Sequence, residues 1–423
     1  MFSQSDNSLK GAEKLDHLDK LSHFREEFSI PKMDNGEEKL YFAGHSLGLM
    51  PWKAKENVKE VFDSWAKYGV DGHFEGEYPW LPYHEFLTEK MAEVVGAKSS
   101  EVVVMNTLTT NLHMMMVSFY RPTKKRYKIL IENNAFPSDQ YAVDSQARFH
   151  GFDPKEAILE LGSDSREPEV IDVDDIIRKI EDIGEELSIV MLGNVNYLSG
   201  QSFPMKKVVN AAHKVGAFVG FNLAHGAGNL VLELHNDGAD FAVWCSYKYL
   251  NSGPGGLAAA FVHERHHGLK EMPRFEGWWG HDKESRFQME RNFSPINSAE
   301  AWQLSNPPIF QLATIRASLD LFSLAGMKNI REKGDNLTGY LEYLMNENCS
   351  EFTEVVTPKE RGSMLCIRLK GSIMPQLFAD ELGKKGLIVD FRMPNILRIC
   401  PAPLYNSFSD VYQLIQVMMY TAK

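Results

Sequence analysis

The sequence is poor in cysteine and has no long apolar run. It contains four cysteines among 423 residues, and none has the CxxC spacing typical of zinc ribbons or of redox pairs. No apolar run approaches the roughly 18 residues that a membrane helix needs, and the polar N-terminus does not resemble a secretion signal. We therefore expect a cytoplasmic protein with reduced cysteines and no contact with a membrane.

Positive charge is also scarce. There are 45 lysine and arginine residues against 57 aspartate and glutamate residues, which gives a formal net charge of -12. This balance, together with the lack of a basic tract, argues against a nucleic-acid partner. Because 43% of the residues are hydrophobic, the chain can bury a large core. We expect a soluble globular protein with one larger and one smaller domain.

Short apolar runs alternate with helical patterns through much of the chain. The runs predict strands at residues 101–105, 128–132, 188–193, 217–221 and 239–244. Helical patterns between them predict a mostly parallel sheet with right-handed crossovers, in which ligands bind at the carboxyl ends of the strands. From about residue 308 the pattern changes to one long amphipathic helix and a mixed α/β tail. We divide the chain into residues 1–70 (an N-terminal arm and helix that contribute to the small domain), 71–310 (the large domain) and 311–423 (the small C-terminal domain).

One lysine follows a predicted buried strand directly. Lys248 lies between Tyr247 and Tyr249, just after the run 239–244. Burial among aromatic side chains disfavours a charged amine, and an uncharged amine is a good nucleophile toward a carbonyl group. This pattern is typical of a Schiff-base lysine.

Two further loops follow predicted strands, and each has two interpretations. Thr107 and Thr109 stand where a strand leads into a helix, so this turn either binds a phosphate at the helix N-terminus or only caps the helix. The segment from Phe136 to Asp139 predicts a rigid loop, in which the aromatic ring either stacks on a flat cofactor or belongs to a simple turn.

Three polar residues are candidates for substrate contacts. Ser46 lies in a glycine-rich loop, His73 in an irregular aromatic segment, and Arg398 just before a proline. Each has an alternative interpretation: a chain turn for Ser46, a solvated side chain for His73, and a structural salt bridge in place of a carboxylate clamp for Arg398.

The sequence also contains an H-E-x-x-H pattern, formed by His263, Glu264 and His267. On a helix, this pattern would place two imidazoles on one face for zinc. Here it follows a strand-like run, and Lys270 stands where the metzincin continuation needs glycine. We therefore expect no metal site.

Five segments are similar to those of the kynureninase family, and the resemblance spans nearly the whole chain. They are MNTLTTNLHMMMVSFY, AFPSDQYA, CSYKYLNSGPGG, GWWGH and LSNPPI. The resemblance implies the α/β fold of type I transferases that depend on pyridoxal 5'-phosphate (PLP), in which a large cofactor-binding domain has a mostly parallel sheet with helices on both faces, followed by a smaller α/β domain. It implies an obligate homodimer with shared active sites. The implied reaction is hydrolysis of L-kynurenine or 3-hydroxy-L-kynurenine to anthranilate or 3-hydroxyanthranilate and L-alanine, a step of tryptophan degradation.

The resemblance also implies roles for individual residues. Lys248 would bind the cofactor covalently, and Tyr247 is our candidate for the acid and base steps. The implied cofactor contacts are Leu108, Thr109, Phe136, Pro137, Ser138, Asp139, Asn222, His225, Tyr247, Trp278 and Asn306. The implied substrate contacts are Ser46, His73, Asn306 and Arg398. Trp278 and Asn306 would come from the neighbouring subunit.

The chain departs from the family pattern at three positions. Asn222 stands where the family has an aspartate that pairs with the cofactor's pyridine nitrogen. Leu198 stands where the family usually has a tyrosine, and this chain has Tyr197 one position earlier. Gly193 stands where serine is common. A charge-assisted hydrogen bond contributes about 1.5–3 kcal/mol, so its loss would lower the rate by about one to two decades. Two alternatives therefore stay open: a weakened or silent PLP-binding homologue, and a related PLP-dependent β-lyase or transaminase.

Overall fold

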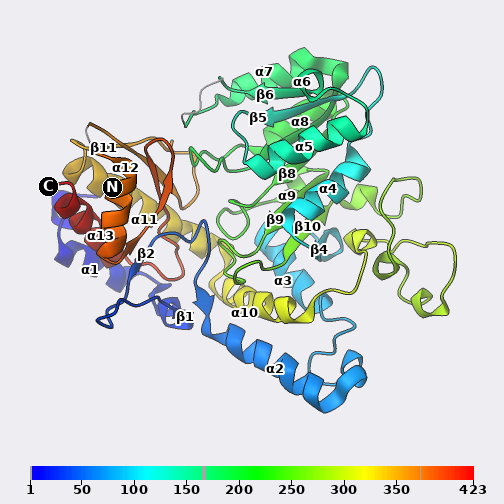
Figure 1. Cartoon of the computed structure of the whole chain (residues 1–423), viewed down its shortest axis with the longest axis horizontal. Coiled ribbons are helices and arrows are strands. Elements are labelled where there is room, and N and C mark those ends of the chain that lie inside the picture. Colours follow the sequence, from blue (N-terminus) through cyan, green and yellow to red (C-terminus); the bar gives the residue numbers. More distant parts are fainter. Residues whose placement is uncertain (1, 164–167, 372) are drawn as a thin grey trace.

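A seven-stranded sheet forms the centre of the larger part of the molecule (Figure 1). The computed structural model describes residues 2–163, 168–371 and 373–423. The strand order is β4-β10-β9-β8-β7-β5-β6, and β10 runs antiparallel to both of its neighbours while the other pairs are parallel. The strands are β4 (Val102–Val104), β5 (Lys128–Glu132), β6 (Ile158–Leu161), β7 (Leu187–Gly193), β8 (Phe218–Asn222), β9 (Phe241–Cys245) and β10 (Ala258–Val262). The predicted mostly parallel sheet is confirmed.

Helices cover both faces of this sheet. Successive strand residues point to opposite faces, so Val103 packs with Phe119 on one side while Val104 packs with Met91 on the other. The first face is covered by α4 (Leu108–Phe119) and α5 (Pro137–Phe149). The second is covered by α3 (Glu85–Val95), α7 (Val173–Ile183), α8 (Met205–Lys214) and α10 (Ile309–Ala325), and short helices α6 (Pro154–Ala157) and α9 (Leu234–Asp237) lie in connections.

A second, four-stranded sheet forms the smaller part, with the order β11-β12-β15-β14. Its strands are β11 (Thr353–Val355), β12 (Leu365–Leu369), β14 (Asp390–Arg392) and β15 (Ile396–Ile399). The helices beside it are α11 (Met327–Asn348), α12 (Pro375–Lys384) and α13 (Phe408–Thr421). The single long helix predicted from residue 308 is wrong, because the chain breaks at Gly326, whose φ of 75° ends α10 before α11 begins.

The N-terminal arm lies on the smaller part, and both termini are found there (Figure 1). Helix α1 (Leu9–Leu18) contacts α13, where the Asp16 carboxylate accepts hydrogen bonds from the backbone N–H groups of Phe408 and Ser409 at 2.6 and 3.1 Å. Two small two-stranded sheets pair β1 (Phe28–Ser29) with β3 (Met50–Pro51) and β2 (Leu40–Tyr41) with β13 (Leu387–Ile388).

Helix α2 (Trp52–Tyr68) packs along α10 at the lower edge of the view in Figure 1. Among the described residues, no helix combines the length and apolar character that a membrane crossing requires.

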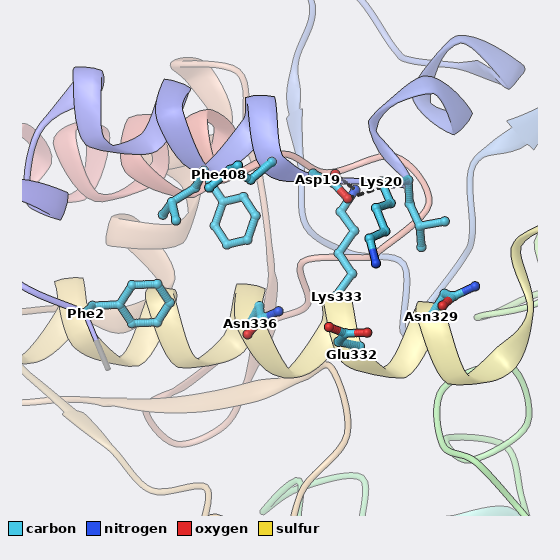
Figure 2. Close-up of a pocket in the computed structure, with 11 residues that line it drawn as sticks. Phe2, Asp19, Lys20, Asn329, Glu332, Lys333, Asn336 and Phe408 are labelled. Carbon is cyan, nitrogen blue, oxygen red and sulfur yellow. Dashed lines mark hydrogen bonds and ion pairs between the residues drawn. The ribbon is translucent and has the colours of Figure 1, made fainter.

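A cavity of about 280 Å³ separates the N-terminal arm from α11 (Figure 2). Lys333 projects from α11 across this space, and its Nζ lies 2.6 Å from Oδ2 of Asp19. The two side chains are only 7% and 5% exposed. This buried ion pair ties the arm to the smaller part of the molecule.

Candidate active site

The candidate site is a pocket at the carboxyl ends of the parallel strands, where the sequence predicts it. Residues from several strand ends and from α4 and α5 line it: Leu108, Thr109, Glu132, Phe136, Ser138, Asp139, Gly193, Val195, Tyr197, Asn222, Ala224, His225, Tyr247 and Lys248. Most of the cofactor contacts that the sequence predicts therefore lie together.

Lys248 lies in this pocket, and no carboxylate of the described residues forms an ion pair with its amine. Its Nζ is 3.2 Å from Nε2 of His225 and 5.9 Å from the centre of the Phe136 ring. Burial lowers the pKa of the Lys248 amine, and the nearby guanidinium of Arg398 acts in the same direction. The geometry therefore favours the uncharged, nucleophilic form of the amine that the sequence predicts.

Two buried histidines border this amine. The pKa of His225 lies well below its usual value, mainly because of burial and then because of the neighbouring Lys248. The ring of His45 lies 6.4 Å from that of His225, and burial lowers the pKa of His45 to about 4. Both imidazoles are neutral at pH 7, so they add no positive charge beside Lys248.

Arg398 reaches the site from β15 of the second sheet. Its Nε donates to Asp390 at 2.8 Å, its Nη1 donates to the Tyr197 carbonyl at 2.9 Å, and its Nη2 also pairs with Asp390. The ion pair lowers the pKa of Asp390 below its usual value against the opposing effect of burial. The salt bridge considered from the sequence is thus present, but a guanidinium carries more N–H groups than these bonds use.

Two carboxyl groups and an amide meet at the floor of the pocket. The Asn222 side-chain NH₂ donates to Oδ2 of Asp139 at 2.7 Å, and its carbonyl oxygen accepts from the Ala224 N–H at 2.9 Å, which fixes the orientation of the amide. Oδ1 of Asp139 is buried and has no hydrogen-bond partner among the described residues. The carboxyl of Glu132 accepts from the Gly193 N–H at 3.1 Å.

Burial raises the pKa of both carboxyl groups, to about 8 for Glu132 and to about 6 for Asp139. The charge of Asp139 also raises the pKa of Glu132. Glu132 is therefore mostly protonated at pH 7. Asp139 loses its proton at a lower pH than Glu132, and the hydrogen bond from Asn222 favours its ionised form.

The predicted loop from Phe136 to Asp139 needs correction. Pro137 begins α5, so Ser138 and Asp139 lie in the first turn of a helix. Proline is favoured at a first helical position because its missing N–H is not needed there. The Phe136 ring still faces the pocket, 5.4 Å from the ring of Tyr197.

The predicted turn after β4 has no side-chain cap. Helix α4 begins at Leu108, and the side chain of Thr107 makes no capping hydrogen bond, because its hydroxyl pairs with Thr110 at 3.0 Å. Leu108 and Thr109 line the pocket, so the free N–H groups of this helix end lie beside it. The anion-binding interpretation is therefore favoured over plain capping.

Six predicted contacts do not line this pocket within one chain: Ser46, His73, Pro137, Trp278, Asn306 and Arg398. Ser46 and Asn306 are exposed, and Trp278 is 42% exposed. The His73 Nδ1 lies 2.9 Å from the Val70 carbonyl, and its ring packs against Trp80 at 5.3 Å.

Sequence reasoning assigned no role to Glu132, His45 or Asp390, all of which lie at or beside the site. Glu132 is the last residue of β5, so its position at a strand end was the available signal. His45 and Asp390 carried no such signal. The Leu198 departure is smaller than it seems, because Tyr197 lines the pocket and Leu198 is buried away from it.

Comparison with known proteins agrees with the fold and the site. The aminotransferase class-V family model matches residues 83–391. The kynureninase of Myxococcus xanthus is 56% identical over 416 residues, covering 98% of this chain and 97% of that protein. The kynureninase of Christiangramia forsetii is 49% identical over 421 residues, covering 98% of each. The kynureninase of Nematostella vectensis is 45% identical and covers 97% of this chain and 93% of that protein.

Solved structures with much lower identity share the fold. The cysteine desulfurase CsdA of Escherichia coli has a TM-score of 0.75 at 17% identity, covering 95% of this chain and 98% of that one. The cystine C-S lyase C-DES, in complex with cysteine persulfide, has a TM-score of 0.75 at 14% identity, covering 90% and 97%. The fold, the lysine at the strand ends and the full-length similarity lead to one conclusion: the chain belongs to the kynureninase family, within the class-V aminotransferases.

Proposed function

We propose that this protein hydrolyses the Cβ–Cγ bond of L-kynurenine or 3-hydroxy-L-kynurenine with pyridoxal 5'-phosphate as cofactor. The products are anthranilate or 3-hydroxyanthranilate and L-alanine. The observation that carries the proposal is Lys248, a buried amine with a lowered pKa at the carboxyl end of the sheet, beside His225 and the Phe136 ring. Three kynureninases at 45–56% identity, aligned over nearly their whole length, support hydrolysis over lyase or transaminase chemistry.

The residues present fit this cofactor. The orphaned Oδ1 of Asp139 is a buried acceptor that a protonated pyridine nitrogen would satisfy. The uncapped N-terminus of α4 suits a phosphate, and the ring of Phe136 suits stacking. Lys248 would attach the cofactor covalently, and the remaining proposed contacts of this chain are Leu108, Thr109, Pro137, Ser138, Asn222, His225 and Tyr247.

Asp139 can supply the negative charge that Asn222 lacks. Although Asn222 is uncharged, its amide donates to a carboxylate in the same pocket, so a negative charge remains available for the pyridine nitrogen. The silent-homologue alternative assumed that this negative charge is lost, so the main argument for it no longer applies. The similarity to kynureninases does not favour that alternative either.

The bound cofactor would supply an electron sink for the substrate's α-carbon. The uncharged amine of Lys248 is placed to take the α-proton at its Nζ. Burial raises the pKa of the Tyr247 phenol above its usual value, so at pH 7 the phenol holds its proton and can donate it to the γ-carbonyl oxygen. The remaining N–H groups of Arg398 would bind the α-carboxylate.

The test is direct. We expect purified protein supplied with PLP to release fluorescent anthranilate or 3-hydroxyanthranilate from the corresponding kynurenine, with L-alanine in equal amount. Activity only on amino acids without the aryl ketone would instead support a β-lyase or a transaminase. No product from either kynurenine would refute the proposal.

We also propose that the active protein is a homodimer. An apolar hollow of about 730 Å³ lies beside the active site, lined in part by Leu47, Met50, Val58 and Phe62. Its rim begins at Gly48, whose N–H donates to the Tyr247 carbonyl at 2.8 Å. Exposed apolar surface of this extent is typical of an interface.

The exposed positions of Trp278 and Asn306 fit the same proposal, in which a second subunit brings them to the site. A complementation test separates this from other roles. We expect Lys248→Ala and Asn306→Ala to be inactive alone, but mixed subunits to regain about a quarter of wild-type activity, because half of the random dimers carry one intact site. Two inactive variants that stay inactive after mixing and exchange would contradict shared sites.

A cytoplasmic location remains our proposal, and the four cysteines, all buried free thiols, are compatible with it. The division into residues 1–70, 71–310 and 311–423 also remains a proposal. It is supported by Ala12 and Phe42, which pack in the core of the second sheet.

A further inference from the structure

A second cluster of potential ligands lies at the edge of the sheet opposite Lys248. Glu101 precedes β4, His263 follows β10, and His235 lies on α9. Because β10 runs antiparallel to β9, its last residue pairs with Phe241 at the start of β9, while Lys248 follows the other end of that strand. The five residues of β9 separate the two regions by about 15 Å.

The ligand atoms of these three residues converge. Each residue offers one ligand atom within 4.8 Å of the others. Nδ1 of His235 lies 2.9 Å, and Nδ1 of His263 3.6 Å, from Oε1 of Glu101. The two imidazole rings stack at 5.1 Å with an angle of 27° between their planes. Two rings from separate segments thus direct nitrogen atoms at the same carboxylate.

Glu101 is fully buried, yet no lysine or arginine side chain of the described residues forms an ion pair with it. Its oxygens accept hydrogen bonds from the backbone N–H groups of Lys98 and Glu264, at 3.0 and 2.9 Å, and Nδ1 of His235 lies within hydrogen-bond distance of both oxygens, at 2.9 and 3.2 Å. These bonds hold the carboxylate in place but leave its charge to the two histidines. A buried carboxylate of this kind is stable when a cation lies beside it.

The histidines are suited to supply lone pairs. The side chain of His263 is only 12% exposed. Its Nδ1 accepts only one long hydrogen bond, 3.3 Å from the Arg265 N–H. The side chain of His235 is 27% exposed, which leaves a path from solvent.

A second cluster, made of one histidine and two glutamates, shows the contrast. His84, Glu85 and Glu300 also bring their ligand atoms within 4.8 Å of one another. There, however, Nζ of Lys283 lies 2.9 Å from both carboxylates. An ammonium group already supplies the positive charge at that site, and the Glu101 cluster has no equivalent.

We propose that Glu101, His235 and His263 bind one divalent transition-metal ion such as Zn²⁺. Two imidazoles and one carboxylate are a ligand set that suits zinc, with a further position left for water. The ion would join β4, β10 and α9 at the edge of the sheet far from the reaction. This proposal replaces the expectation of no metal site. The H-E-x-x-H pattern contributes only His263, because Glu264–His266 form a 3-10 turn and Nε2 of His267 lies 2.9 Å from the Val262 carbonyl oxygen.

Equilibrium dialysis of the full chain, loaded with PLP, against micromolar ZnCl₂ tests this. We expect the wild type to retain one more zinc ion per chain than the variant His235→Gln/His263→Gln, as measured by mass spectrometry of the metal. His267→Gln is the matched control from the same pattern and should retain as much zinc as the wild type. Zinc should raise the Tm of the wild type and the control by at least about 2 °C, and that of the double variant by less.

Equal zinc content in the wild type and the double variant would overturn the proposal. If the double variant does not fold, the wild type alone still decides: Co²⁺ bound to two nitrogens and one carboxylate gives visible d–d absorption that Zn²⁺ abolishes. Absence of that band at saturating Co²⁺ would also overturn the proposal, and Mg²⁺ should not compete, because it prefers oxygen ligands.

Discussion

Lys248 and Lys333 are both enclosed lysines whose pKa burial lowers, but their neighbours differ. Lys333 has a carboxylate partner, Asp19, at 2.6 Å, which counteracts the effect of burial (Figure 2). Lys248 has the uncharged imidazole of His225 at 3.2 Å and the positive charge of Arg398 nearby. One amine lies in an ion pair, and the other forms no ion pair with the described residues.

The comparison teaches that burial alone does not make a lysine reactive. Burial disfavours the ammonium form in both places, and the sign of the nearest charge then decides the outcome. Near Lys248, the charge of Asp139 raises the pKa of the amine, but this carboxylate hydrogen-bonds Asn222 and forms no ion pair with the lysine.

Replacing the reactive lysine should abolish the reaction. We expect Lys248→Ala to lower kynurenine turnover by at least about a thousandfold, since the chain loses both its cofactor attachment and its base. Steady-state assays and borohydride reduction followed by mass spectrometry would measure the two losses. Lys333→Met is the control and should keep turnover; activity in Lys248→Ala would mean that another amine does the work.

Removing the partner of the structural lysine should destabilise the fold. Asp19→Asn leaves a buried ammonium unpaired, and we expect the free energy of unfolding to fall by about 3–5 kcal/mol in urea titrations at pH 7. The double variant Asp19→Leu/Lys333→Met, which removes both charges, should recover most of this loss. A change below about 1 kcal/mol in Asp19→Asn would show that the pair is solvated, as surface pairs are.

Asp139 should be the charged hydrogen-bond acceptor for the pyridine nitrogen of PLP. Loss of a charge-assisted bond of about 1.5–3 kcal/mol predicts that Asp139→Asn weakens PLP binding about ten- to a hundredfold. Asn222→Asp should change the affinity less, because two adjacent carboxylates share one negative charge near neutrality. Fluorescence titration of the cofactor-free protein measures both, and the reverse order of effects would assign the acceptor role to residue 222.

The smallest effect concerns pH. Because the pKa of Glu132 rises from 4.5 to about 8 on folding, the folded protein binds an extra proton between these values. The free energy of unfolding of the cofactor-free protein should therefore fall as pH rises through this window. Glu132→Gln should flatten the slope, whereas Glu56→Gln on the exposed face of α2 should leave it. A slope unchanged by Glu132→Gln would count against a protonated Glu132.

The sequence located the reactive lysine because a strand pattern and an unusual neighbourhood coincide within a few residues. It also placed Asp139 near the cofactor, but as part of a loop, because the signal of Pro137 for a helix start was overlooked. It could not find His45 or Asp390, since their importance comes from side-chain contacts that folding creates. His45 lies beside Asp390 and His225, which are far away along the chain, and Asp390 pairs with Arg398 across two neighbouring strands.

The amino-acid order by itself determined the alternation of strands and helices, the strand ends that carry chemistry and the family of the protein, because these depend on local patterns. The tertiary structure alone decided which charges face one another. It gave Lys333 a carboxylate and withheld one from Lys248, and it brought Glu101 beside His235 and His263. The reason is physical: a pKa or a ligand set depends on distances between side chains, and only folding sets those distances for residues far apart in the chain.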